Sequence, residues 1–255
     1  MVNAALQDPA VIRQHLGEEG IRIAWFSLGS VPVIELAGQN FDVALIDLEH
    51  GLWDKASAHL AIGMLGVPGI VRSADSSRAR IGEALDSGAA GVLVPAVVNA
   101  DQASAIVDAS HYPGAGSRSG GGVHPLSRGF DQYYRRCHDP VVGAMIENVE
   151  ASRNAEAIAN VPGIDFLFIG TGNLALSLGC FPQVDDRLDE QCRIILDACH
   201  RAQKPCGILT GSAAWARQKQ AEGYRAVVIA DDISIVRHGF VAAAQTALNQ
   251  DRIHR

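Results

Sequence analysis

The feature that most limits how this chain can fold is a recurring short apolar segment, each copy followed by a turn signal and a stretch with helical periodicity. These segments predict strands at residues 21–28, 43–47, 69–72, 91–95, 142–147, 165–169, 206–209 and 225–230. The strands are apolar throughout rather than alternating, as in parallel sheets that are covered on both faces. Helices are predicted between them, most clearly at residues 76–88, 99–110, 149–160, 189–202 and 212–223.

Eight strand–helix units favour an α/β fold of the closed (β/α)8, or TIM barrel, type over an open doubly wound sheet, which more often has about five to seven strands. The length of 255 residues suits one such barrel, although length alone would also allow one and a half average domains. The chain shows no linker, no low-complexity tract and no repeat beyond the strand–helix unit. Residues 1–255 are therefore predicted to form a single barrel domain.

Composition and charge exclude several classes of function. The formal net charge is −7 and the chain has only three lysines, which argues against a nucleic-acid surface. No apolar run reaches the roughly 18 residues needed to cross a bilayer, and the N-terminus lacks the pattern of a secretory signal. The five cysteines form no CxxC pair and are expected to be buried reduced thiols. We therefore expect a cytoplasmic protein with neither a nucleic-acid nor a membrane partner.

Polar side chains end or follow four of the predicted strands, namely the second, third, fifth and sixth. In a barrel of this kind catalytic groups lie at the carboxyl ends of strands. These groups are therefore expected to meet at one mouth of the barrel. Ions that are buried together there must pair with one another or bind a metal. The alternative is an ion network of Asp47, Arg72 and Glu147 that only holds the barrel closed. The strand-end residues are Asp47, Glu49, His50, Arg72, Glu147, Asn148, Gly170, Thr171, Gly172 and Asn173.

The lysines bear on the chemistry available at such a mouth. A Schiff-base aldolase needs a lysine inside the barrel, but Lys55 and Lys219 fall in predicted helices and Lys204 lies just before a strand. An enolate would then have to be stabilised by a metal ion, an arginine or backbone amides.

Several long blocks of the sequence, in order, resemble the HpcH/HpaI aldolase family of metal-dependent pyruvate aldolases. The resemblance spans about residues 20–245 and is carried by FDVALIDLEHG (41–51), VR (71–72), GAAGVLVPAVVNADQA (88–103), YPGAGSR (112–118), IENVEASRNAEAIANVPGIDFLFIGTGNLALSLG (146–179) and GILT (207–210). It implies a barrel of the phosphoenolpyruvate/pyruvate-binding type and a carbon–carbon lyase that acts on 4-hydroxy-2-oxo acids through a pyruvate enolate.

The resemblance also implies roles for single residues. His50 would be the general base, with Asp47 orienting its ring, and Arg72 would bind the 2-oxo oxygen of the substrate. Glu147 would be a ligand of a divalent cation such as Mg²⁺, Mn²⁺ or Co²⁺. The backbone amides of Gly170 and Gly172 would hold the substrate carboxylate. Trp25, as a substrate-binding residue, and Glu49 would have supporting roles near the mouth.

Two positions depart from the family pattern. Asn173 stands where the family has an aspartate as its second metal ligand, so the metal site would be Glu147 and Asn173, with one carboxylate and a lower cation affinity. Met145 stands where a glutamine is usual, which removes a polar contact to the substrate or to a metal-bound water.

The glycine-rich connection 111–140 is expected to form a loop and a short helix over the rim of the active site. It lacks the spacing and the lysine of a phosphate-binding loop, so a flexible lid is the simpler interpretation. From this lid Arg118, His124 and Arg128 could meet a distal acid group of the substrate, and Arg118 is predicted as a substrate-binding residue.

Two other functions remain open. One is a condensing enzyme of the citrate synthase type, as in siderophore biosynthesis, which would join acetyl-CoA to oxaloacetate with weakened or absent metal dependence; Asn173 and Met145 favour it. The other is a barrel without activity that binds an oxo acid as a sensor. The family resemblance further implies a homo-oligomer, a hexamer built from dimers that exchange the last helix, predicted at residues 232–250.

Overall fold

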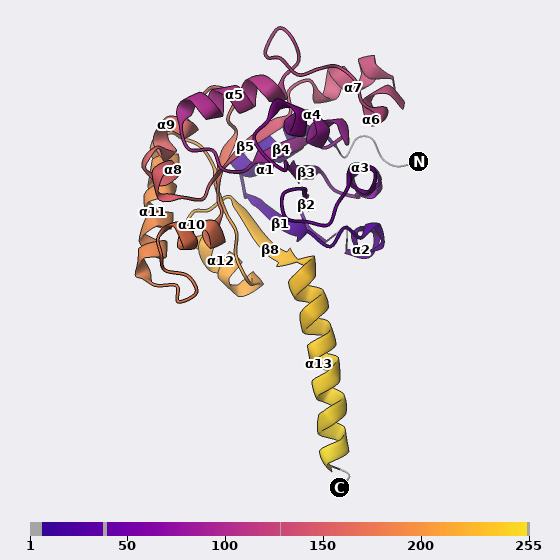
Figure 1. Ribbon diagram of the computed structural model, residues 1–255, viewed down its shortest axis with the longest axis vertical. Coiled ribbons are helices and arrows are strands. Elements are labelled where there is room, and N and C mark those ends of the chain that lie inside the picture. The colour runs from indigo at the N-terminus through magenta and orange to yellow at the C-terminus, as the bar shows by residue number, and fades with distance from the viewer. Residues whose placement is uncertain (1–6, 38–39, 128, 254–255) are drawn as a thin grey trace.

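The computed structural model describes residues 7–37, 40–127 and 129–253. Its strands pair in parallel in the order of the sequence, and the last pairs with the first to close a barrel (Figure 1). The predicted TIM barrel is therefore confirmed, and every predicted strand lies within two residues of an observed one. The strands are β1 (Ile21–Phe26), β2 (Val43–Asp47), β3 (Gly69–Arg72), β4 (Gly91–Val94), β5 (Val141–Ile146), β6 (Phe166–Ile169), β7 (Cys206–Ile208) and β8 (Ala226–Asp231).

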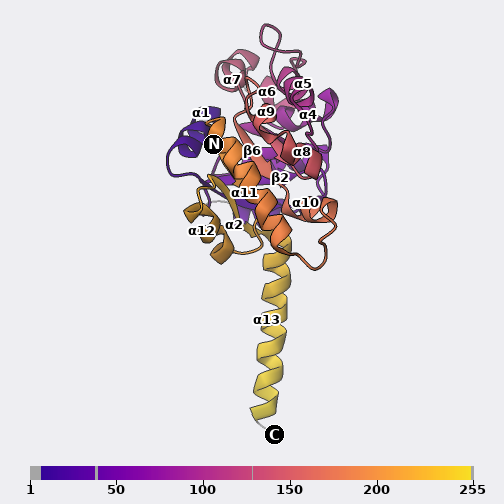
Figure 2. The ribbon, with the colours of Figure 1, turned by 90° about the vertical axis from the view of Figure 1, so that its left-hand side faces the viewer.

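Helices surround the barrel and connect its strands (Figures 1 and 2). Many begin at a side chain that accepts a backbone N–H, for example Ser77, Asn99 and Ser212. The helices are α1 (Pro9–Gly17), α2 (Val31–Ala37), α3 (Lys55–Met64), α4 (Arg78–Asp86), α5 (Ala100–Ser110), α6 (Val123–Ser127), α7 (Phe130–Cys137), α8 (Val149–Arg153), α9 (Ala155–Ala159), α10 (Thr171–Ser177), α11 (Asp186–Arg201), α12 (Ala213–Ala221) and α13 (Asp232–Ile253).

Side chains of each strand alternate between two apolar cores. On β1, Ile23 and Trp25 point into the barrel, whereas Ala24 and Phe26 pack beneath the helices. Two glycines make room for the aromatic rings that fill the interior. A Cβ at Gly143 would lie 2.4 Å from Cζ of Phe166, and one at Gly207 would lie 2.5 Å from Cδ2 of Phe168. The interior is thus packed solid below the mouth.

The last helix departs from the barrel instead of packing on it. Both views show α13 projecting from the end of β8 into the solvent (Figures 1 and 2). Its described residues include exposed apolar side chains: Ile233, Ile235, Val236, Phe240 and Val241. In the described part of the chain, no helix has the length and apolar character that a membrane span requires.

Candidate active site

A cavity of about 470 Å³ opens at the carboxyl ends of the strands. It is the place where the strand-end rule predicts catalytic groups. Residues from seven strands or the segments that follow them line it: Trp25, Ser27, His50, Arg72, Met145, Glu147, Gly170, Thr171, Gly172, Asn173, Leu209, Thr210, Gly211, Trp215 and Asp231. Arg72 and Glu147, on which the sequence interpretation depends most, therefore face the same space.

Arg72 lies between two carboxylates. Its Nε and Nη2 donate to Oδ1 and Oδ2 of Asp47 at 2.8 and 2.6 Å, and its Nη1 lies 2.7 Å from Oε2 of Glu49. Its guanidinium also lies over the ring of Trp25, 4.8 Å from the ring centroid. These contacts fix the planar head group of a side chain that is only 7% exposed and that lines the cavity.

Asp47 and Glu49 differ in how readily they ionise. Burial by itself would raise the pKa of Asp47, but the hydrogen bonds and the charge of Arg72 outweigh it and hold this pKa below its usual value. Burial raises the pKa of Glu49, and the charge of Glu147 adds to this, so the opposing effect of Arg72 is outweighed. The site therefore has one carboxyl fixed as an anion and another that keeps its proton to higher pH.

The structure changes the expected relation between Asp47 and His50. Asp47 accepts from the backbone N–H of Glu49 and of His50, from the hydroxyl of Ser27 and from the indole of Trp25, besides Arg72. None of its described contacts reaches the His50 ring. The carboxylate near that ring is Glu49, with Oε1 3.8 Å from Nε2. The His50 side chain is 63% exposed and lines the cavity.

Glu147 is held by two donors from neighbouring strand ends. Its Oε1 accepts from the backbone N–H of Ala96 at 2.7 Å, and its Oε2 accepts from Nδ2 of Asn173 at 2.8 Å. Ala96 has a φ of +55°, an uncommon conformation for a residue with a side chain, and this turns its N–H toward the carboxylate. Sequence reasoning missed Ala96, because nothing in an alanine signals a backbone donor.

The expected carboxylate-binding amides are only partly available. The N–H of Gly170 donates to the carbonyl of Ile146 at 3.2 Å, so it is used in the sheet, and the expectation for Gly170 as an amide donor is wrong. Its small size matters instead, because a Cβ there would lie 3.0 Å from Oε2 of Glu147. Gly172 lies in the first turn of α10, where backbone N–H groups have no partner within the helix.

Met145 occupies the floor of the cavity beside Arg72, with Sδ 3.9 Å from Nη1. The side chain is 2% exposed and belongs to the barrel interior. An apolar thioether therefore packs where the resemblance leads one to expect a polar amide.

The connection 111–140 does not cover this mouth, which corrects the sequence expectation. It leads from the end of α5 to the start of β5 and so lies at the amino-terminal ends of the strands. Arg118 is 1% exposed, with Nη2 2.9 Å from Asp86 and 3.2 Å from the hydroxyl of Tyr133, and its guanidinium lies over the ring of Tyr112. It is a buried structural residue, not a lining residue of the cavity.

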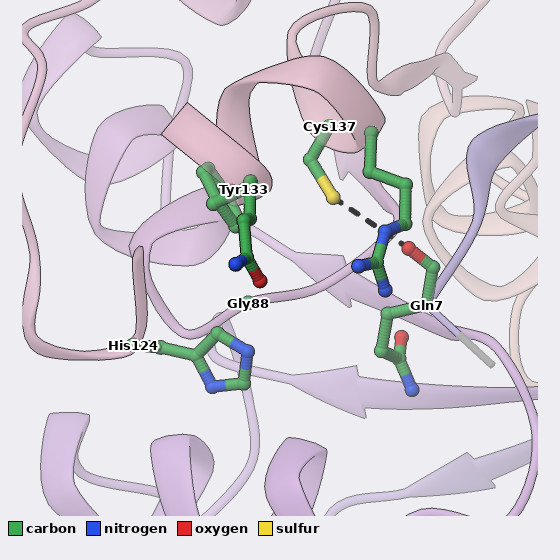
Figure 3. Close-up of a pocket in the computed structure, with 7 residues that line it drawn as sticks. Gln7, Gly88, His124, Tyr133 and Cys137 are labelled. Atoms are coloured by element: carbon green, nitrogen blue, oxygen red, sulfur yellow. Dashed lines mark hydrogen bonds between the residues drawn. The ribbon is translucent and has the colours of Figure 1, made fainter. Parts of the chain in front are cut away.

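His124 belongs to the same end of the barrel, and Arg128 lies outside the described residues. Figure 3 shows His124 beside Gly88, across a small cavity from Cys137, whose thiol contacts the carbonyl of Gln7. This cavity measures about 50 Å³, roughly a tenth of the cavity at the carboxyl ends of the strands.

The three lysines also lie away from the mouth, as the sequence indicated. Lys204 donates to the carbonyl of Ile164, and Lys219 pairs with Glu222 on α12. Lys55 begins α3 and lines cavities along the outside of the barrel.

Sequence reasoning missed Asp231, although it ends an apolar strand as Asp47 does. The predicted strand stopped one residue before it.

The sequence profile of the HpcH/HpaI aldolase/citrate lyase family matches residues 22–239. The chain belongs to this family. A hydroxypyruvate/pyruvate aldolase of Rhizorhabdus wittichii is 36% identical over 83% of the chain and 88% of its own length. A 4-hydroxy-2-oxovalerate aldolase of Rhodococcus jostii is also 36% identical, over 83% of the chain and 85% of its own length.

Solved structures agree with the assignment to the HpcH/HpaI family. A family member from Burkholderia cenocepacia superposes with a TM-score of 0.84 at 27% identity, covering 94% of this chain and 98% of its own. The citrate synthase SbnG superposes with a TM-score of 0.80 at 26% identity, covering 94% and 98%. The family and its named relatives are lyases of the aldolase type, which makes an enzyme the supported interpretation and leaves the sensor without support.

Proposed function

We propose that this protein cleaves and forms 4-hydroxy-2-oxo acids by way of a pyruvate enolate. The observation that carries the proposal is that Arg72 and Glu147 face one cavity at the carboxyl ends of the strands, with His50 at its rim. The aldolase relatives, at 36% identity over most of the chain, support the same reaction.

In the cleavage direction His50 would take the proton of the 4-hydroxyl group. The bond between C3 and C4 then breaks, an aldehyde forms at C4, and the electron pair passes through C3 to the oxygen on C2. Arg72 would stabilise that oxygen as its negative charge grows, because its fixed guanidinium needs no rearrangement during the step. A proton delivered to C3 completes pyruvate.

Glu49, rather than Asp47, is placed to assist His50. Its Oε1 lies nearest the imidazole, and its other oxygen pairs with Arg72. Its raised pKa suits a group that exchanges protons, whereas the lowered pKa of Asp47 suits a permanent counter-ion. We assign Asp47 to positioning Arg72 and Glu49 to positioning and charging His50.

The HpcH/HpaI family generally uses a divalent metal ion, and the residues here can offer two oxygen donors to one. Glu147 has a carboxylate at the cavity, and turning the Asn173 amide would present its oxygen beside it. Among the described residues no group of three His, Cys, Asp or Glu side chains gathers to hold a metal. A Mg²⁺, Mn²⁺ or Co²⁺ ion held by Glu147 and Asn173 would polarise the 2-oxo group.

A pyruvate-release assay on a series of 4-hydroxy-2-oxo acids tests the proposal directly. We expect turnover by the native protein and a loss of about 100-fold or more in His50→Ala. His15→Ala, an exposed histidine on α1, is the matched control and should retain full activity. Absence of pyruvate release from every acid, together with no entry of deuterium into the methyl group of pyruvate, would refute the function.

A condensation of the citrate synthase type is the second candidate. It is favoured by the hydrogen bond between Asn173 and Glu147, which satisfies the carboxylate without a cation, and by the similarity to SbnG. Release of free CoA from acetyl-CoA and oxaloacetate would establish it, and no release under conditions that support aldol cleavage would eliminate it.

We further propose that the protein forms a homo-oligomer, a hexamer built from dimers, in which α13 is exchanged between protomers. The support is that α13 projects from the barrel with apolar side chains exposed, a surface that a second copy of the chain would cover (Figure 1).

A further inference from the structure

The cavity extends beyond the groups that the proposed chemistry uses. Arg72 ends β3, and Glu147 and Asn173 follow β5 and β6. A second side of the cavity wall is formed by residues that follow β7 and end β8, among them Thr210, Trp215 and Asp231, and none of these has a role so far. A substrate whose oxo-acid end lies on Arg72 would extend its other end toward them.

Asp231 brings a negative charge to this second side. It is the last residue of β8 and pairs in register with Trp25 of β1, which places it at the level of the mouth. One carboxylate oxygen accepts the N–H of Ser234 at 2.8 Å, which fixes the side chain at the start of α13. A carboxylate has two acceptor oxygens, so the other oxygen can accept a hydrogen bond from a hydroxyl or another donor on a substrate.

No Lys or Arg from the described residues balances Asp231 within the cavity. Arg72 is the single Lys or Arg among the described lining residues, and its guanidinium already pairs with Asp47 and Glu49. A substrate tail with its own carboxylate would therefore face Asp231 without a counter-ion, and such like-charge juxtaposition is unfavourable.

Neutral groups find suitable partners on the same side. Trp215 is half-buried and offers an aromatic surface to the carbon chain of a hydroxylated compound. The Thr210 hydroxyl donates to the carbonyl of Val228, so its oxygen can accept a hydrogen bond from the substrate. Two acceptors beside an aromatic ring match a tail that carries hydroxyl groups.

We propose that the acceptor side of this cavity selects a short, uncharged, hydroxylated aldehyde, and that Asp231 excludes aldehydes that carry a carboxylate. This inference rests on the proposed aldol reaction, since it concerns the aldehyde partner of that reaction. It runs against the sequence-based expectation that arginines of the 111–140 segment meet a distal acid group.

The test compares two acceptors in the synthesis direction with pyruvate, namely glycolaldehyde and succinic semialdehyde. The native protein should give a kcat/KM at least about tenfold higher for glycolaldehyde. Asp231→Asn and Asp231→Ser both keep an acceptor for the N–H of Ser234, and each should lower that ratio about tenfold. Asp101→Asn, an exposed position on α5, is the matched control and should leave the ratio unchanged.

Deuterium entry into the methyl group of pyruvate separates the two possible failures, because it reports enolate formation without any acceptor. No exchange in the native protein would mean that the proposed function itself is wrong. Exchange accompanied by equal use of both acceptors, or by a ratio that Asp231→Asn and Asp231→Ser leave unaltered, would overturn the role of Asp231 alone.

Discussion

At the scale of single residues, the site is organised around one guanidinium and two unlike carboxyl groups. Asp47 lies below the cavity and is almost fully buried, so its hydrogen bonds to Arg72 are protected from water. Glu49 is nearer the cavity, and burial raises its pKa. A single strand end thus supplies both the permanent anion that orients Arg72 and a carboxyl group that can change protonation.

Replacing Arg72 with lysine tests the importance of the guanidinium shape. Lysine keeps the positive charge but cannot donate in parallel to both oxygens of Asp47 while pointing another N–H at the substrate. We expect kcat/KM for cleavage to fall about 100-fold, measured by pyruvate release. Arg78→Lys, at the exposed start of α4, is the control; equal losses in both variants would contradict the prediction.

Asp47→Asn should destabilise the fold by about 3 kcal/mol at neutral pH, because it removes the charge partner of a buried arginine. The native pKa of Asp47 is lowered, so its stabilising contribution is complete above the unfolded pKa of about 3.9 and is lost as the pH falls through the folded value. Urea unfolding of both proteins should therefore give a difference that is constant from pH 7 to about pH 5 and shrinks below about pH 4. A difference that grows on acidification would refute this.

Asn173→Asp should increase the affinity for Mn²⁺ about tenfold or more, since it adds a second carboxylate beside Glu147 and removes an amide that competes for it. Titration calorimetry of the purified proteins with Mn²⁺ measures this without reference to turnover. An unchanged or lower affinity would show that Asn173 does not face the bound ion.

The residues of the site were predictable to different degrees. Asp47, Arg72 and Glu147 were found because each is a polar residue that ends or follows an apolar strand, a pattern visible in one dimension. The partners of those residues were not predictable. The Asp47 carboxylate could have contacted either His50 or Arg72, and only the distances in the structure decide between them. The prediction for the amide of Gly170 was wrong for the same reason, because a sequence does not show which acceptor a backbone N–H donates to.

At the scale of elements, strands were easier to predict than the connections. The eight strands are easy to recognise because each is an apolar run that is buried on both faces. The helix predicted at 149–160 is instead divided at Asn154, whose amide donates to the carbonyl of Val98. The face on which segment 111–140 lies follows from its place in the chain. A connection that leaves a helix and enters a strand must lie at the amino-terminal face, whatever glycines it contains.

The glycines of the barrel interior give a prediction at this scale. Gly143→Ala should destabilise the protein by about 2 kcal/mol, because the new methyl group would overlap the ring of Phe166 and the interior cannot expand. In contrast, Gly82→Ala on α4 meets nothing within 4 Å and should be neutral or stabilising by up to about 1 kcal/mol. Urea unfolding of both variants distinguishes them, and a neutral Gly143→Ala would contradict the packing argument.

At the scale of the whole molecule, the helix α13 projects from the barrel and leaves an apolar surface of the single chain uncovered. It follows β8, where a barrel of this kind normally packs its eighth helix against the sheet, yet its apolar side chains are exposed. The sequence predicts a helix here but not the direction in which it runs. An apolar helix face does not reveal which surface it packs against.

Phe240→Asp tests whether a neighbouring copy covers α13. Phe240 is 76% exposed in the single chain, so the substitution should leave the barrel fold intact but weaken an assembly that buries the ring. Light scattering after size-exclusion chromatography should show a smaller mass for Phe240→Asp than for the native protein, with Gln245→Asp as the control on the same helix. An identical mass for all three would rule out a contact at Phe240.

Arg72 ends β3 and Asp231 ends β8, with β1 and β2 between them in the ring, and the binding of the two fragments at these separate places has a kinetic consequence. Once the bond is broken, the two fragments share no contact: the anionic fragment stays paired with the guanidinium, while the neutral one is retained only by weak hydrogen bonds. We therefore expect the aldehyde to depart first and pyruvate last, so that pyruvate inhibits competitively against the hydroxy-oxo acid and the aldehyde does not.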